Sequence, residues 1–177
     1  HDTFIENVDI ILVDGVSKFG NGVEVSVLNE TGGREVPIYN GLSASLAYLI
    51  ALYRHRPALI LRLQAMIADF VERQTGNYGF IGNHVKIINT GTVRNTVIAD
   101  YATVENCTRL DNGTVNSNAN APVYIGDSVI AEDFIISSGA VVADAAKIIR
   151  CFIGQACHVT QVRSEKLEAY VDNVKQE

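Results

Sequence analysis

The amino-acid sequence predicts a mainly β protein that folds as a left-handed parallel β-helix, a solenoid built from a six-residue repeat. The strongest observation is a column of aliphatic residues within 125–161, spaced by six residues with an occasional five. These aliphatics are Ile125, Ile130, Ile136, Val142, Ile148, Ile153 and Val159. A small or acidic residue directly follows most of them. A step of six does not fit a helix, which repeats every ~3.6 residues, whereas fixed-period self-similarity is typical of a solenoid.

Each six-residue unit of such a β-helix supplies one short strand and one turn, and three units complete a triangular coil. The aliphatic residue then points into the prism and stacks on its equivalent roughly 18 residues away. The alternative is a set of buried strands in an α/β sheet, which needs crossover helices between its strands. Residues 77–161 show no helical pattern, and this favours the solenoid.

The repeat is already present, more weakly, near the N-terminus. Val13, Phe19 and Val25 lie six residues apart, and each is followed by a small or acidic residue. We therefore expect residues 2–36 to form the first coils of the β-helix.

The apolar period then changes from six to helical spacing. Ser43 is suited to cap the start of a helix, and Pro57 suits the first turn of a second helix. Both segments carry an apolar stripe. The pattern predicts a helical hairpin at 41–75, inserted into the solenoid.

The repeat resumes at 77–161, where we expect the main coils, with a loop insertion at 115–124. Insertions in repeat proteins often lie on the binding face, and a tolerated surface loop is the alternative. The residues expected to be buried along the prism axis are Ile98, Val104, Leu110, Ile125, Ile130, Ile136, Val142 and Ile148. Phe134 and Phe152 are expected to stack on consecutive coils, filling the core or offering an exposed aromatic contact.

Asn or Asp stands two places after five of the aliphatics, a position suited to turn geometry with positive φ. These residues are Asn89, Asn95, Asp100, Asn106 and Asn112. The tail at 163–177 has apolar residues at helical spacing among charges. It predicts a short C-terminal helix that caps the open end of the solenoid.

Composition limits the class of protein. The 177 residues are 47% hydrophobic and carry a net charge of −6, which argues against a nucleic-acid-binding groove. Three cysteines without a CxxC pair indicate a reducing compartment, so we expect a cytoplasmic protein. The longest apolar run is too short to span a membrane. The chain starts at His1 in the middle of a pattern, and we expect it to be a fragment of a longer protein.

Two histidines and four cations are the candidate site residues. His84 and His158 fall in or beside turns and should point outward, where an imidazole can act as a general base; the alternative is an ordinary exposed histidine. The cations that could hold an anionic substrate are Arg54, Arg56, Lys86 and Arg94. Arg54 and Arg56 equally suit the negative end of a helix dipole. No metal-ligand spacing and no nucleotide-binding fingerprint is present.

Several stretches carry a family resemblance. IGNHVKI, IADYATVENC, IGDSVIAEDFIISSGAVV and IRCFIGQACHV resemble the hexapeptide-repeat transferase superfamily. VDGVSKFGNGVEVSVLNETGGREVPIYNGLSA, ALYRHRPALI and DFIISSG with CFIGQACH resemble, more closely, a large bacterial β-helix family labelled as a domain of unknown function. That family is similar to the β-helical parts of sugar-nucleotide pyrophosphorylases and acyltransferases. The resemblance covers residues 2–158 and implies trimers with acyl-CoA or sugar-nucleotide substrates.

Two functional hypotheses follow. The first is a transferase module that moves an acyl group from acyl-CoA, a co-substrate rather than a tightly bound cofactor, to a sugar or sugar nucleotide. His84 or His158 would be the base, in a cleft between the prisms of a homotrimer, and His84 is favoured because Lys86 and Arg94 follow it closely. The second is a non-catalytic β-helical scaffold for oligomerisation or ligand binding in a larger protein.

Overall fold

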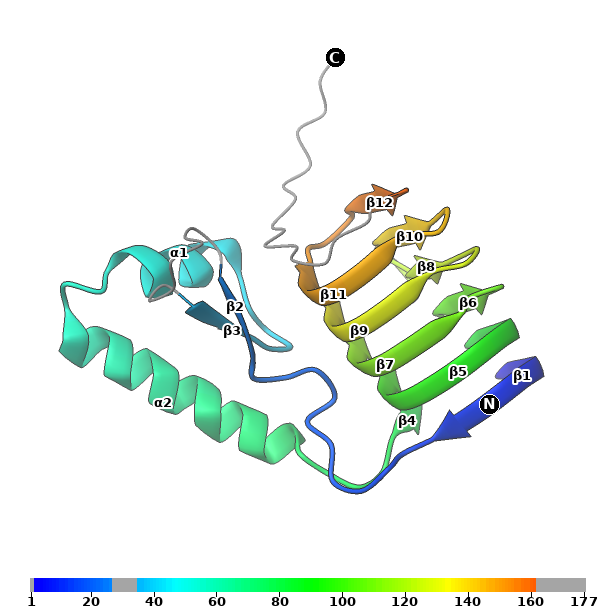
Figure 1. Cartoon of the computed structure of the whole chain (residues 1–177), viewed down its shortest axis with the longest axis horizontal. Helices are drawn as coiled ribbons and strands as arrows, with labels where there is room; N and C mark the ends of the chain where they lie inside the picture. The colour runs from blue at the N-terminus through cyan, green and yellow to red at the C-terminus, as the bar shows by residue number, and fades with distance from the viewer. Residues whose placement is uncertain (1, 27–34, 162–177) are drawn as a thin grey trace, which may run out of the picture.

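The protein is mainly β, a parallel β-solenoid of about five turns accompanied by two helices (Figure 1). The structure, a computed structural model, describes residues 2–26 and 35–161. The C-terminal helix predicted at 163–177 lies outside the described residues. The parallel solenoid expected from the six-residue period is therefore confirmed.

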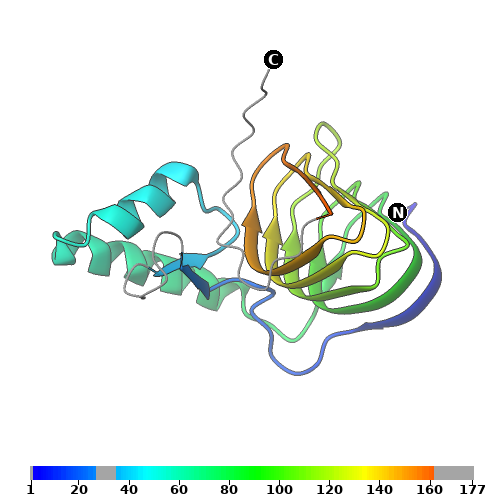
Figure 2. The ribbon, with the colours of Figure 1, turned by 45° about the horizontal axis from the view of Figure 1, so that its top comes forward.

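Ten strands form the solenoid, and every pairing among them is parallel. They are β1 (Phe4–Leu12), β4 (Phe80–Ile81), β5 (Lys86–Ile98), β6 (Thr103–Glu105), β7 (Arg109–Val115), β8 (Tyr124–Ile125), β9 (Ile130–Ile136), β10 (Val141–Ala143), β11 (Lys147–Ile153) and β12 (His158–Thr160). The longer strands β5, β7, β9 and β11 bend around one corner, so that each covers parts of two faces (Figure 2).

One coil takes 17 residues, not the roughly 18 that equal steps of six would give. Ile87 pairs with Val104, and Val142 pairs with Val159, each 17 positions further along. The exception is the coil that joins Val104 to Ile125, which is 21 residues long. Its additional residues form a tight turn closed by the bridge between Asn118 and Ala121, seen as the protruding loop in Figure 2.

Three columns of inward side chains form the solenoid core. The first is Ile87, Val104, Ile125, Val142 and Val159; the second is Val93, Leu110, Ala131 and Ile148; the third is Ile81, Ile98, Val115, Ile136 and Ile153. Seven of the eight residues expected to be buried are buried. The prediction for Ile130 is wrong, because this residue is half-buried and pairs with Arg109. Ala131 faces inward in its place, between Leu110 and Ile148.

Phe134 occupies the core beside the small Ala131. Its ring lies against Gly113 of the preceding coil, where a Cβ would come within 2.2 Å of it. Phe134 pairs with Cys151, and Phe152 pairs with Ile135, so the two phenylalanines do not stack as expected. The 17-residue coil explains the difference, because residues 18 apart fall on opposite sides of the strand.

Asparagine and aspartate are frequent at the corners of the coils. Asn89, Asn95, Asn106 and Asn112 have φ between 48° and 53°, which confirms four of the five expected positions. At the fifth, Tyr101 rather than Asp100 has positive φ. Their side chains also connect successive coils, as where Asn89 Nδ2 donates to Asn106 Oδ1 at 3.2 Å. Short polar side chains tolerate this conformation and can hydrogen-bond locally.

A second unit lies beside the solenoid and has its own core; we call it the helical unit. It contains the antiparallel pair β2 (Val23–Ser26) and β3 (Glu35–Ile38), and the helices α1 (Ala44–Leu52) and α2 (Pro57–Gln74). The buried residues that cluster in this core are Val36, Tyr39, Ile50, Ala51, Ile67 and Val71. No helix in the described part of the chain is long and apolar enough to cross a bilayer.

The segment 2–36 differs from the expected set of coils. Only β1 joins the solenoid, and Val25 pairs with Val36 in the antiparallel sheet. The six-residue spacing of Val13, Phe19 and Val25 is therefore not a β-helix column. Strand β2 pairs with its neighbour in the chain instead of with a coil.

Residues Ser17–Asn21, which we call the docked segment, attach the helical unit to the outside of the solenoid. The Thr114 hydroxyl donates to the Phe19 carbonyl at 2.7 Å, and the Gly20 amide donates to Asn112 Oδ1 at 3.0 Å. Gly20 has φ +80°, and a Cβ on it would come within 2.5 Å of the Phe134 carbonyl oxygen. Only glycine permits this approach of the two backbones.

Candidate functional site

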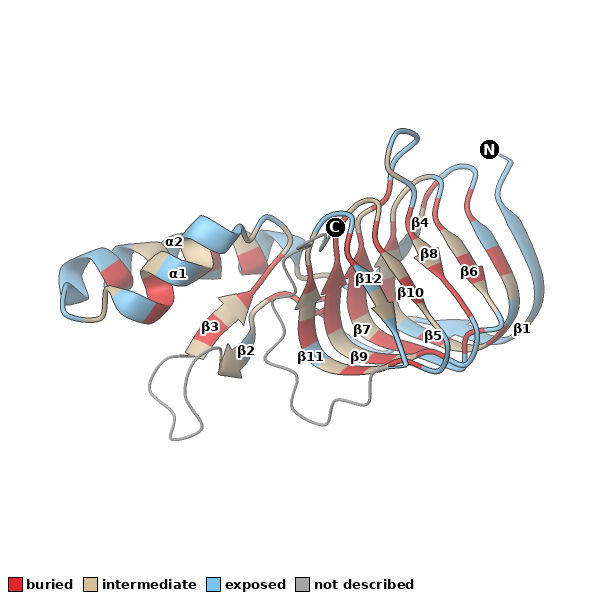
Figure 3. Ribbon diagram, turned by 90° about the horizontal axis from the view of Figure 1, so that it is seen from above, coloured by how far each residue is buried: buried red, intermediate tan, exposed pale blue. Residues whose placement is uncertain are grey.

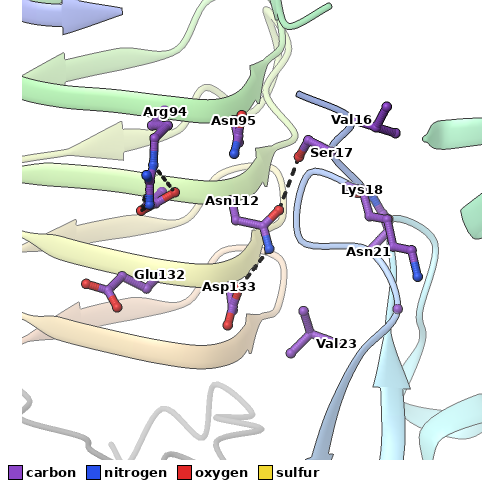
Figure 4. A pocket seen from close by; sticks show the side chains of 12 residues that line it. Val16, Ser17, Lys18, Asn21, Val23, Arg94, Asn95, Asn112, Glu132 and Asp133 are labelled. Carbon is purple, nitrogen blue, oxygen red and sulfur yellow. Dashed lines mark hydrogen bonds and ion pairs between the residues drawn. The ribbon is translucent and has the colours of Figure 1, made fainter. Parts of the chain in front are cut away.

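The surface has two hollows of interest. One of them contains charged side chains and is lined in part by the docked segment; we call it the corner groove. Its volume is about 650 Å³. Three consecutive coils line it with two residues each, Arg94 and Asn95, Asp111 and Asn112, and Glu132 and Asp133. The opposite wall is Val16, Ser17, Lys18, Asn21, Gly22 and Val23 (Figure 4).

The charges of this groove are largely paired. Arg94 donates from Nε to both carboxylate oxygens of Asp111, at 3.0 and 3.1 Å, and from its terminal nitrogen at 2.5 Å. These hydrogen bonds, with the charge of Asp111, raise the pKa of Arg94. Glu132 forms an ion pair with Arg109 on the preceding coil. The groove therefore offers oriented polar groups with little net charge.

Asn112 is the centre of the hydrogen-bond network in the groove. Its Oδ1 accepts from the Gly20 amide and from the Ser17 hydroxyl at 3.3 Å, and its Nδ2 donates to Asp133 Oδ1 at 2.6 Å (Figure 4). Lys18 is exposed, and its side chain forms no hydrogen bond or ion pair with another described residue. The network fixes Asp133 and leaves Lys18 available to a ligand.

The second hollow, which we call the helix-start pocket, lies between the start of α1 and the solenoid and measures about 670 Å³. The residues that begin α1 form one wall and the end of one solenoid face forms the other. Its lining contains hydroxyl and amide side chains and no charged residue.

His84 is at a corner of the solenoid, exposed as expected. Its φ is 55°. Its ring stacks on Tyr101 of the next coil with centroids 4.8 Å apart, and its Nδ1 is 3.9 Å from a carboxylate oxygen of Asp2. An imidazole held between a carboxylate and an aromatic ring has a fixed orientation and access to solvent.

The structure does not bring the other candidate residues to His84, apart from Lys86. Lys86 begins β5 and is exposed two residues along. His158 begins β12 and stands in the same outward column as Lys86, four coils further on. Arg94 lies beyond the Asn89 corner, in the corner groove. A single site containing His84, Lys86 and Arg94 is not formed within one chain.

Arg54 and Arg56 lie between α1 and α2, at the end of the helical unit away from the solenoid (Figure 1). Arg54 donates from Nε to the Ile50 carbonyl at 3.1 Å and from its terminal nitrogen to the Glu35 carbonyl at 2.7 Å. The bond to Ile50 satisfies a backbone carbonyl at the C-terminal end of α1. This is the helix-end role that the sequence offered as the alternative to anion binding. Arg56 is exposed at the start of α2.

The cysteines are structural. Cys107, Cys151 and Cys157 are buried in the solenoid and form no disulfide. Burial raises the pKa of Cys107 and of Cys151 to about 12, so neither thiol is ionised near neutral pH. Among the described residues, no group of three or more His, Cys, Asp or Glu side chains could hold a metal ion.

Sequence reasoning missed Lys18, Asp111, Glu132 and Asp133 as residues of one groove. Asp111 follows Arg94 by one 17-residue coil, and this period would have placed the two in one outward column. Glu132 continues the column after a coil of 21 residues, which a fixed period does not predict. Lys18 had no such signal.

Comparison with known proteins places the chain in a family. An uncharacterized protein of Treponema pallidum (strain Nichols) is 27% identical over 146 residues, which are 76% of this chain and 20% of that protein. The chain thus spans a fifth of the length of this relative. No solved structure matches it. Residues 1–177 match one family over their whole length, and the chain belongs to that family, described as Domain of unknown function (DUF4954).

Proposed function

We propose that this chain is a ligand-binding module of a larger protein and that its corner groove holds a polyhydroxylated ligand, a sugar or the sugar part of a sugar nucleotide. The observation that carries the proposal is the lining of the groove by hydrogen-bonding side chains from three successive coils and the docked segment. We further propose that the solenoid is a left-handed β-helix of the hexapeptide-repeat type, with the helical unit as its insertion. Residues with positive φ recur at its corners, which supports this geometry.

The chemistry of the groove favours hydroxyl groups over a strongly charged ligand. Arg94 is neutralised by Asp111, and Glu132 by Arg109. Side chains of this kind present both donors and acceptors in fixed positions, which a sugar hydroxyl can use in both directions. Lys18 can add a contact to a phosphate linked to the sugar.

Isothermal titration with a panel of sugars and sugar nucleotides tests this proposal. Lys18→Ala removes an exposed side chain without a described partner, so the fold should survive while affinity falls by about tenfold. Arg62→Ala, which removes an exposed cation of α2 that lines neither hollow, is the matched control and should bind like wild type. Absence of binding across the panel, or equal losses in both variants, would contradict the assignment.

A second candidate function is acyl transfer from acyl-CoA to a sugar or sugar nucleotide with His84 as base; His158 is the other candidate. The position of His84 beside Asp2 and Tyr101 favours it. The acceptor hydroxyl would attack the thioester carbonyl, the imidazole would take the hydroxyl proton, and the coenzyme thiol would leave with a proton. His84→Ala and His158→Ala should be assayed for release of the coenzyme thiol. Lys86→Ala tests whether this lysine contributes to the affinity for the coenzyme phosphates. Turnover that survives in His84→Ala would exclude His84 as the base.

The transferase also requires neighbouring subunits, because His84 and Arg94 lie apart within one chain. We propose a homotrimer with closed cyclic symmetry. Exposed apolar side chains on β1 support association; they are Phe4, Ile5, Ile10, Ile11 and Leu12. Light scattering that reports a monomer at micromolar concentration would contradict the trimer. We propose a cytoplasmic location, because the sequence contains three cysteines without a CxxC pair.

A further inference from the structure

The helix-start pocket has unused hydrogen-bond donors on the side of α1. Ser43 caps the helix: its hydroxyl accepts from the Leu46 amide at 3.3 Å and its carbonyl accepts from the Ala47 amide at 2.9 Å. The amides of Ala44 and Ser45 have no acceptor among the described residues. The first amides of a helix carry partial positive charge. No acidic residue stands in the first turn of α1.

An independent observation comes from the opposite wall. Ser137 follows the inward Ile136, so its side chain points outward, into the pocket that it lines. The residue is only 8% exposed, yet its hydroxyl has no hydrogen-bond partner in the part of the chain that the structure describes. A buried hydroxyl without a partner is unusual in a folded protein. It indicates that a ligand group belongs beside it.

The pocket also has room for that group. Gly154 occupies the outward position one coil above Ser137. A Cβ at Gly154 would meet only the Cys157 sulfur, at 3.4 Å, and otherwise would project into open space. The missing side chain therefore keeps the wall of the pocket open next to Ser137.

We propose that the helix-start pocket binds an oxyanion group of a small molecule, a phosphate, sulfate or carboxylate, held by the amide of Ala44 and by the hydroxyl of Ser137, two residues that line it. Both groups are donors, and the lining contains no carboxylate that would repel an anion. The site is separate from the corner groove and does not depend on the function proposed for it.

The test is titration of the whole chain with sodium phosphate, sodium sulfate and sodium acetate, with sodium chloride at matched ionic strength as reference. Amide resonances of Ala44 and Ser45 should shift and saturate with at least one oxyanion and not with chloride. The three salts distinguish a tetrahedral group from a planar carboxylate.

Two substitutions remove one donor each. Ala44→Pro deletes an amide hydrogen at the first position of α1, where helices accept proline. Ser43, with φ −114° and ψ 158°, already has the extended conformation required before proline. Ser137→Ala deletes the buried hydroxyl. Each should weaken oxyanion binding by about tenfold, because a hydrogen bond to a charged group is lost.

Ser128→Ala is the matched control, an exposed serine at another corner that lines neither hollow, and it should bind like wild type. Gly154→Leu should block the pocket and abolish binding while the far-ultraviolet spectrum is kept. Lys18→Ala should leave oxyanion binding unchanged, so failure of the corner groove is distinguished from failure of this site. Wild-type affinity in both Ala44→Pro and Ser137→Ala, or shifts in chloride equal to those in the oxyanions, would overturn the proposal.

Discussion

The first and the middle coils of the solenoid contain the same kind of residue in the same column with opposite burial. Ile5 pairs with Ile87 and continues the column that contains Ile125. Ile5 is 47% exposed, whereas Ile125 is fully buried. In Figure 3, β1 at one end of the solenoid is largely exposed, whereas β7 and β9 contain buried segments. Burial in a solenoid is therefore set by the coils on either side, and not by the residue itself.

The largest effect should come from a charge in a middle coil. Ile136→Asp places a carboxylate without a partner among fully buried side chains. It should cost several kcal/mol, at least ~4, and prevent stable folding. Circular dichroism and urea unfolding provide the measurement. A cooperative transition near that of wild type would contradict the position of Ile136 in the core.

Overpacking between two middle coils should have the next largest effect. Gly113→Ala directs a methyl group into the ring of Phe134 and should destabilise by about 1–3 kcal/mol. Adding Phe134→Leu should recover part of the loss, because a smaller side chain vacates the space. Urea unfolding of the two single variants and the double variant measures the coupling; simple additivity would argue against the contact.

High pH should weaken the solenoid through two buried thiols. Burial raises the pKa of Cys107 and Cys151 to about 12 from 9.0, so the unfolded chain loses these protons first. The free energy of unfolding should fall as pH rises above 9, by about 1 kcal/mol per thiol at pH 10, and this contribution should be complete near pH 12. A variant with both cysteines replaced by alanine should show a flatter dependence on pH.

The smallest effect should come from a charge in the first coil. Ile5→Asp repeats the chemistry of Ile136→Asp at a position where water already reaches the side chain. We expect a change of about 1 kcal/mol or less in the chain studied alone. A loss as large as that of Ile136→Asp would mean that another molecule covers β1 in solution.

The parts of the fold that depend on local period were predictable. Val104 and Val142 were placed correctly because each is six residues from the neighbouring aliphatic on both sides. Ile130 was placed incorrectly because the sequence does not mark where the step of five falls, and both Ile130 and Ala131 are acceptable in a core. The antiparallel partner of Val25 was missed because its spacing imitates the repeat.

The candidate site was less predictable than the fold. The exposure of His84 followed from its place in a turn, and its proximity to Lys86 followed from their separation of two residues. The corner groove requires the docked segment, where Gly20 meets Asn112 across 92 residues of sequence. No periodicity encodes that contact, since it depends on how a separate unit lies against the outside of the coils.

Pairing of β1 with β5 also affects the order of events during synthesis. Asn7 and its partner Asn89 are 82 residues apart, so β1 leaves the ribosome well before the strand it needs. At roughly 5–20 residues per second, the wait is about 4–16 s. For that time the strand Phe4–Leu12 lacks the partner that β5 provides. A strand that waits for its pairing partner exposes an edge to which a chaperone can bind.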